Sequence, residues 1–440
     1  MTRYVHEPRG LPVPNSRASR MARLGGMAAG VAGSMAVQGG RQLLTGRRPK
    51  FEELLLTPGN AARITAQLAQ MRGAAMKVGQ LLSLEGGDFL PPELAEILGH
   101  LRADAHFMPP QQLDQVLRRN WGPDYRRKFA KFDVRPVAAA SIGQVHRARM
   151  KDGRDVALKI QYPGVRDSID SDVRNVASLM RVSGLVPKEI DLAPLMEEAR
   201  RQLHEEADYA READMLARFG ALLDKDPDYL VPEGHPDLTT PDILGMSFVE
   251  SVAVESLTEA DAETRNRVVA GLIRLMLREL FEFGLMQTDP NFANYRYQPA
   301  TGRIVLLDFG ASRAFATGLV AQYHDLMRAG LSADRSATRS AMEAIGFLEP
   351  GTAPKHREPI LDMVDMAMTP LRSDAPVNFA TTPLARELRE AGMEFAEDRD
   401  FWVIPPMDAL YLQRKMGGMF LLAARLRAEI AIRPLLEPYL

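Results

Sequence analysis

The residues best placed to do chemistry are two acids and an amide near residue 300. Asp289 opens an Asp-x-x-x-x-Asn segment that ends at Asn294, and Asp308 heads an Asp-Phe-Gly triplet after an apolar run. Carboxylate and amide oxygens at this spacing hold magnesium and nucleotide in phosphoryl-transfer sites. The pattern predicts phosphoryl transfer or nucleotide hydrolysis, with Asn294 and Asp308 as metal ligands and Asp289 at the catalytic-base position.

Such a site also needs a cation upstream of the acids. Lys159 ends a Val-Ala-Leu-Lys segment predicted to be a strand, and an exposed strand lysine would give the same pattern when taken alone. Because the later acids follow in order, Lys159 is predicted to pair with phosphate oxygens. The helical pattern over about 191–223 offers Glu206, Asp208 and Glu212 as carboxylate partners for this lysine.

The segment before Lys159 lacks the Gly-x-Gly-x-x-Gly loop that covers the phosphates in protein kinases. In its place stand Ala138, Ala139, Ala140, Ser141, Ile142, Gly143, Gln144 and Val145. Alanine disfavours positive φ, so this loop is stiffer than a glycine loop, but its backbone N–H groups and the Ser141 hydroxyl are predicted to contact the nucleotide. The altered loop favours altered nucleotide handling over ordinary protein phosphorylation. Gln287-Thr288 replace the usual His-Arg, which leaves the base role of Asp289 open.

Composition excludes several other classes of site. A net charge of −2 over 440 residues gives no nucleic-acid-binding character, and the absence of cysteine excludes disulfides, thiolate metal sites and thiol catalysis. The eight histidines show no metal-ligand spacing. Residues 1–50 hold nine Lys/Arg against one acid, a net charge of +8, so the remaining residues carry a net charge of −10. Such a basic arm suits an anionic membrane surface or a solvated tail.

Residues 24–40 form an uncharged run rich in glycine and alanine. A membrane-spanning helix needs about 20 apolar residues, so a flexible or re-entrant segment is the alternative to a membrane segment. Gly26 and Gly30 stand four apart, a spacing that lets two helices approach closely in lipid and would allow a homodimer.

Hydrophobic periodicity predicts the elements that must position these residues. Helices are expected over 51–120, 166–182 and 191–223, strands over 137–148, 155–160 and 304–308, and a strand-rich stretch over 229–250. The segment from 315 onward is predicted to be helical throughout and to carry no motif. This order indicates an α+β fold.

Several motifs resemble those of one known family. Lys77-Val78-Gly79-Gln80 is similar to the K-x-G-Q motif of the UbiB family of atypical kinases, also called the ADCK family. The alanine-rich loop, the lysine strand, the Glu206–Glu212 segment and both acidic loops resemble the family's other motifs, in its order, over about residues 70–315. The resemblance implies a bilobal protein-kinase-like fold with a small β-rich N-lobe, a helical C-lobe and an N-terminal helical K-x-G-Q extension.

This resemblance also implies domains and roles. The expected segments are 1–50, a basic arm with a candidate membrane segment; 51–128, the helical extension; 129–253, the N-lobe; and 254–440, the C-lobe. Lys77, Gly79 and Gln80 would lie over the peptide cleft, with Lys77 facing Glu206 and Asp208. Glu212 would then pair with Lys159, and ATP and Mg2+ would be the cofactors.

The function implied is that of an atypical kinase or ATPase that binds Mg-ATP, supports ubiquinone (coenzyme Q) biosynthesis at a membrane and does not phosphorylate peptides. Expected partners are membrane lipids or quinone-pathway intermediates and ubiquinone-biosynthesis enzymes. A nucleotide-sensing scaffold or pseudoenzyme organising a lipid-biosynthetic complex, and a kinase for a protein or small molecule, stay open as alternatives. The expected location is cytoplasmic, membrane-associated through the N-terminal segment, and bacterial rather than mitochondrial.

Overall fold

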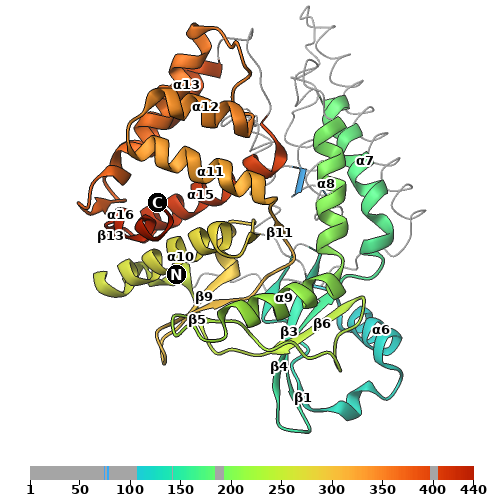
Figure 1. The fold of residues 1–440 in the computed structure, drawn as a ribbon. Helices are drawn as coiled ribbons and strands as arrows, with labels where there is room; N and C mark the ends of the chain where they lie inside the picture. Colours follow the sequence, from blue (N-terminus) through green and yellow to red (C-terminus); the bar gives the residue numbers. More distant parts are fainter. Residues whose placement is uncertain (1–73, 75–76, 79–106, 141, 184–192, 397–404) are drawn as a thin grey trace, which may run out of the picture. The chain divides into compact units, whose positions relative to one another are not determined.

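The computed structural model describes residues 74, 77–78, 107–140, 142–183, 193–396 and 405–440 (Figure 1). These residues belong to two compact units. The first holds the described residues up to 213 together with 234–248, and the second holds 214–233 and the described residues from 249 onward. Residues 214–233 and 249–253, which lie within the expected 129–253 segment, belong to the second unit. The basic arm, the 24–40 run, most of the helical extension, Gly79, Gln80 and Ser141 lie outside the described residues.

An antiparallel sheet forms the centre of the first unit. Its strands are β1 (Phe129–Phe132), β2 (Ala138–Ala139), β3 (Gly143–Met150), β4 (Asp155–Gln161) and β6 (Ile243–Ser247), in the order β1-β3-β4-β6 with β2 also paired to β3. The turn between β3 and β4 contains Gly153 at φ 94°, a left-handed conformation that glycine adopts without steric cost. In the register of the sheet, Lys159 lies between Val145 and Leu244.

Helix α6 (Pro110–Trp121) covers this sheet and completes its core (Figure 1). Leu113, Val116 and Leu117 recur at helical spacing, so one face of α6 is apolar. They pack in one buried cluster with Val156 and Leu158 of β4. The strand that carries Lys159 is therefore anchored by a packed layer on its apolar side chains.

The prediction of one helix over 191–223 is wrong. The segment forms two helices, α8 (Ala193–Glu206) and α9 (Tyr209–Leu223). The side chains of Gln161 and Arg166 donate hydrogen bonds to the carbonyl of Ala207. A carbonyl that leaves the helical ladder needs such partners, and these donors supply them. Helix α7 (Val165–Ser183) precedes α8 and packs along it.

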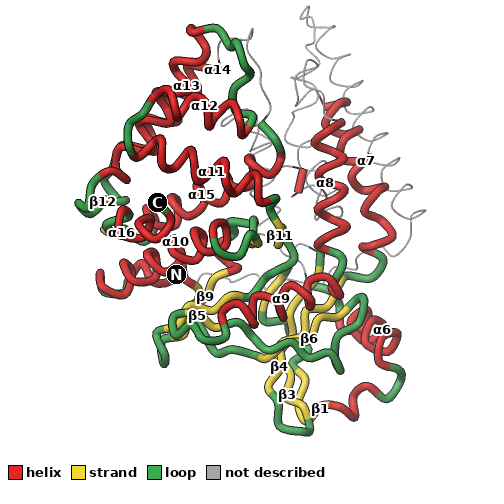
Figure 2. The backbone as a smooth tube through the Cα atoms, in the orientation of Figure 1, coloured by secondary structure: helices red, strands yellow, loops and turns green. Residues whose placement is uncertain are grey.

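The second unit is mostly helical (Figure 2). Its helices are α10 (Ala262–Phe281), α11 (Thr317–Leu331), α12 (Arg335–Ile345), α13 (Pro354–Met368), α14 (Leu384–Ala396), α15 (Met407–Arg425) and α16 (Arg433–Leu436). The expectation of helix throughout from 315 is wrong at two points, because β12 (Val377–Asn378) and β13 (Glu429–Ile430) pair as short strands.

Two small sheets in the second unit carry the acidic loops. One has the order β5-β10-β9-β7, formed by Tyr229–Leu230, Arg303–Leu306, Tyr295–Gln298 and Val252–Ala253. The other pairs β8 (Leu285–Gln287) with β11 (Ser312–Ala314). β8 ends just before Asp289 and β10 ends two residues before Asp308, so each acid lies in the loop that follows a strand.

Candidate active site

Lys159 and Glu212 form a buried ion pair in the first unit. The Lys159 ammonium donates to both carboxylate oxygens of Glu212, at 2.8 and 2.9 Å, and Glu212 is only 1% exposed. The ammonium also lies 5.3 Å from the centre of the Tyr209 ring, close enough for a cation–π contact. These contacts hold the lysine side chain in one position, which a phosphate-binding lysine requires.

The alanine-rich loop joins β2 to β3 beside this lysine strand. A Cβ on Gly143 would lie 2.4 Å from the Ile160 carbonyl oxygen, so only glycine fits where the two strands approach. The side chains of two residues predicted to contact nucleotide, Ile142 and Gln144, face the interior. Ile142 is buried, and the Gln144 side chain accepts the Met108 N–H at 2.8 Å. Their side chains are therefore committed to packing and hydrogen bonding within the unit, and only their backbone groups stay candidates for phosphate contacts.

Lys77 pairs with Glu206 at the end of α8, and both side chains are largely buried. Among the described residues, no ion pair joins Lys77 to Asp208, the second acid that it was expected to face. The Asp208 carboxylate instead accepts the N–H of Arg211 at 3.1 Å, which caps the start of α9. Asp208 thereby fixes the first turn of the helix that carries Glu212.

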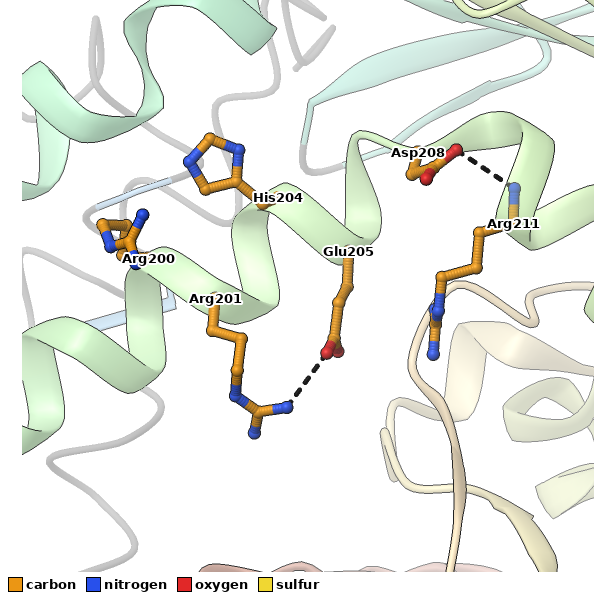
Figure 3. A pocket seen from close by; sticks show the side chains of 6 residues that line it. All are labelled: Arg200, Arg201, His204, Glu205, Asp208 and Arg211. Atoms are coloured by element: carbon orange, nitrogen blue, oxygen red, sulfur yellow. Dashed lines mark hydrogen bonds and ion pairs between the residues drawn. The ribbon is translucent and has the colours of Figure 1, made fainter.

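Figure 3 shows a surface pocket on α8 and α9 next to these acids. Its lining is Arg200, Arg201, His204, Glu205, Asp208 and Arg211. Arg201 donates to Glu205 at 2.9 Å, and Arg200 donates to Glu197. Because acids on the same helix already pair with these arginines, the pocket has little of the unbalanced positive charge that an anion site needs.

In the second unit, Asp289 is engaged through both of its carboxylate oxygens. Asn294 Nδ2 donates to one of them at 3.2 Å, and Arg414 Nη2 donates to the other at 3.3 Å. A short 3-10 turn over Phe292–Asn294 closes the loop, and Asn291 caps it. The carboxylate of Asp289 is thus held in place by these two hydrogen bonds.

The antiparallel pairing of β9 with β10 brings the segment before Asp308 next to Asn294. Tyr295 pairs with Leu306 in the hairpin, and the Leu307 N–H donates to the Asn294 carbonyl at 3.1 Å. Asp308 accepts the Gly310 N–H at 3.0 Å. Phe309 is buried, with its ring 4.9 Å from that of Phe219. Packing of Phe309 therefore anchors the triplet that begins with Asp308.

The oxygen atoms of Asn294 and Asp308 fit magnesium better than any softer metal. Asn294 donates through its amide nitrogen to Asp289, so its Oδ1 is the atom that would bind a metal. Magnesium takes few ligands from protein and completes its shell with water and phosphate. The described residues contain no group of three or more His, Cys, Asp or Glu that could hold a metal by themselves.

Two residues of α15 belong to this region although no sequence motif marked them. Arg414 contacts Asp289, and Lys415 contacts Gln287. They lie more than 120 positions beyond the acidic loop, in a segment expected to carry no motif. In the sequence, the one signal that could have suggested them is a lysine at an apolar position of an amphipathic helix pattern.

Comparisons with known proteins show the family to which this chain belongs. The model of the ABC1 atypical kinase-like domain matches residues 100–342. The chain is 39% identical to the mitochondrial atypical kinase COQ8 of Saccharomyces cerevisiae over 95% of this chain and 83% of that protein. The chain belongs to the ABC1 atypical kinase-like family. The rat protein COQ8B, also named a mitochondrial atypical kinase, is 36% identical over 97% of this chain and 80% of its own length.

Membership of this family confirms the resemblance to UbiB (ADCK) proteins and identifies the chain as an atypical-kinase enzyme. A solved Mycobacterium tuberculosis structure, Rv3197 in complex with erythromycin, superposes with a TM-score of 0.61 at 24% identity, over 87% of this chain and 96% of that one. This likeness, together with the family match, confirms the α+β kinase-like fold.

The predicted location is wrong. The yeast and rat relatives, which match nearly the whole chain, are both named as mitochondrial proteins, which overturns the cytoplasmic and bacterial assignment. That assignment rested on the composition of residues 1–50, which lie outside the described residues. In the ranges that the structure describes, no helix has the length and apolar character needed to cross a membrane.

Proposed function

We propose that this atypical kinase binds ATP with Mg2+ and that its nucleotide chemistry supports ubiquinone biosynthesis. The observation that carries the proposal is the buried Lys159–Glu212 pair, which presents a fixed ammonium as phosphate-binding lysines do. Asn294 and Asp308 would hold Mg2+, which neutralises phosphate charge when bound. The ubiquinone role is drawn from the relatives named COQ8.

We further propose that peptides are not the phosphoryl acceptors. Lys77 is paired with Glu206, and the loop before Lys159 has alanines in place of the usual glycines. Arg414 and Asn294 both donate hydrogen bonds to the Asp289 carboxylate, so its oxygens are already engaged where a catalytic base would accept a proton. Quinone-pathway intermediates or the enzymes that act on them are the proposed partners.

The test compares purified wild type with Asp308→Asn and Asp289→Asn. We expect Asp308→Asn to lower Mg2+-dependent ATP affinity and turnover at least tenfold, because it removes a charged metal ligand. Asp289→Asn should lower turnover while leaving the affinity for Mg-ATP within about twofold, because Asp289 is not one of the proposed metal ligands. Unchanged binding and turnover in Asp308→Asn would sink the assignment.

The pathway claim has a separate test. A deletion strain complemented with wild type or with Asp308→Asn is scored for its quinone content. Restoration by wild type alone is expected. Normal quinone in the deletion strain would remove the pathway claim and leave the nucleotide site standing.

A further inference from the structure

One face of α15 meets the segment that leads into Asp289. Arg414, Lys415 and Gly418 lie at positions that share a helix face. A Cβ on Gly418 would lie 2.2 Å from the Pro290 Cβ, so the helix backbone packs directly on the loop. Any other residue at 418 would push the helix and the loop apart.

Lys415 is a fully buried cation at the centre of this contact, with only 2% of it exposed. Its ammonium donates to the Gln287 carbonyl at 2.6 Å and to the Tyr295 hydroxyl. The carboxylate of Glu279 on α10 lies 3.6 Å away, and it too is almost fully buried. A buried charge is retained only where oxygens replace its water, and here three residues supply them.

Glu279 and Lys415 bind the two backbone groups of the same residue, Gln287. Glu279 Oε1 accepts the Gln287 N–H at 3.3 Å, while Lys415 binds the Gln287 carbonyl. Burial alone would lower the pKa of Lys415, but attraction from Glu279 and the Tyr295 oxygen raises it above its ordinary 10.5, so the side chain stays cationic. Both backbone groups of Gln287 are thus fixed by buried side chains.

Gln287 and Thr288 link the two acidic loops through hydrogen bonds to the segment after Asp308. Gln287 pairs with Ser312 between β8 and β11, just beyond the Asp-Phe-Gly triplet. Thr288 N–H and Thr288 Oγ1 both donate to the Ala311 carbonyl, at 3.1 and 2.8 Å. A shift of Gln287 would therefore move Asp289 and the segment after Asp308 together.

We propose that Lys415, with Glu279, is a positioning residue that sets the placement of Asp289 for turnover by clamping the backbone of Gln287. The consequence for catalysis rests on the proposed nucleotide chemistry, whereas the clamp itself does not. Displacement of a reacting group by about 1 Å can cost a hundredfold in rate. Lys415 touches no nucleotide in this account, so its loss should change kcat more than the KM for ATP.

The experiment uses the full chain with Lys415→Met, the double variant Glu279→Gln/Lys415→Met, and Arg425→Met as the matched control. Arg425 lies on the same helix but pairs with Glu255 at the surface. The double variant leaves no buried charge without a partner, so it carries the test if Lys415→Met alone fails to fold. Two measurements are made: amide hydrogen exchange over residues 287–294 without nucleotide, and kcat with KM for Mg-ATP.

We expect the double variant to exchange at least tenfold faster over 287–294 and to lose at least tenfold in kcat, with KM within twofold and the control unchanged. Wild-type exchange over 287–294 in the folded double variant overturns the clamp, whatever the turnover. Faster exchange with unchanged kcat overturns its catalytic role. A wild type that shows no ATP turnover defeats the proposed function, and the exchange result still decides the clamp.

Discussion

At the scale of single residues, the acids Glu212 and Asp289 of the candidate site differ in their surroundings. Glu212 is almost fully buried and has Lys159 as its partner, so each charge compensates the other. Asp289 lies in a less buried loop between Asn294 and Arg414. Loss of the cation should therefore destabilise the protein more at Glu212 than at Asp289, because a buried carboxylate without its cation is strongly destabilising.

Lys159→Met should therefore lower the free energy of unfolding by about 3 kcal/mol, because it leaves Glu212 buried without a partner. Lys159→Met/Glu212→Gln should recover most of this loss, since neither buried charge remains. Urea unfolding measures both. An exposed pair on α8 offers the control, and Glu197→Gln should cost under about 1 kcal/mol. Equal loss in the single and double variants would contradict this account of the pair.

At the scale of elements, β3 is tied to its surroundings by a buried hydrogen-bond chain. Gln144 accepts the Met108 N–H and donates through Nε2 to His146 Nε2 at 2.8 Å. His146 Nδ1–H then donates to the Asp133 carbonyl at 2.9 Å. In this chain His146 is neutral, and burial holds its pKa below the ordinary 6.5. Protonation would set a second N–H against the Gln144 amide.

This network predicts a pH dependence of stability. The pKa of His146 is lower in the folded state than in the unfolded state, so its contribution is present above pH 6.5 and is lost as pH falls toward the folded pKa. We expect the free energy of unfolding to fall between pH 7 and 5.5 by more in wild type than in His146→Asn. Parallel pH profiles for the two proteins would rule out a role for His146.

At the scale of the whole chain, the family match and the relatives extend over most of the sequence. A ligand that binds only the folded state stabilises it by an amount set by its concentration and affinity. Because Asp308 is proposed to hold the metal of Mg-ATP, the stabilisation by nucleotide should depend on this residue.

Mg-ATP at about 100 times its Kd should raise the free energy of unfolding by about 2.7 kcal/mol. Thermal unfolding with ATP plus Mg2+, ATP plus EDTA, and no ligand measures the effect. Asp308→Asn should lose the part that depends on Mg2+, whereas Arg425→Met should keep all of it. A Mg2+-dependent shift that persists in Asp308→Asn would place the metal elsewhere.

The sequence by itself determined the enzyme class and the α+β fold, because motif residues in a fixed order limit the chemistry and the periodicity of apolar residues limits the elements. It also pointed to the Lys159–Glu212 pairing through a family resemblance. Tertiary structure decided the rest. Asp208 caps α9, because unpaired N–H groups at a helix start attract a nearby carboxylate. Lys415 reaches Gln287 only because the chain returns over 120 residues later, and no local pattern records such a contact.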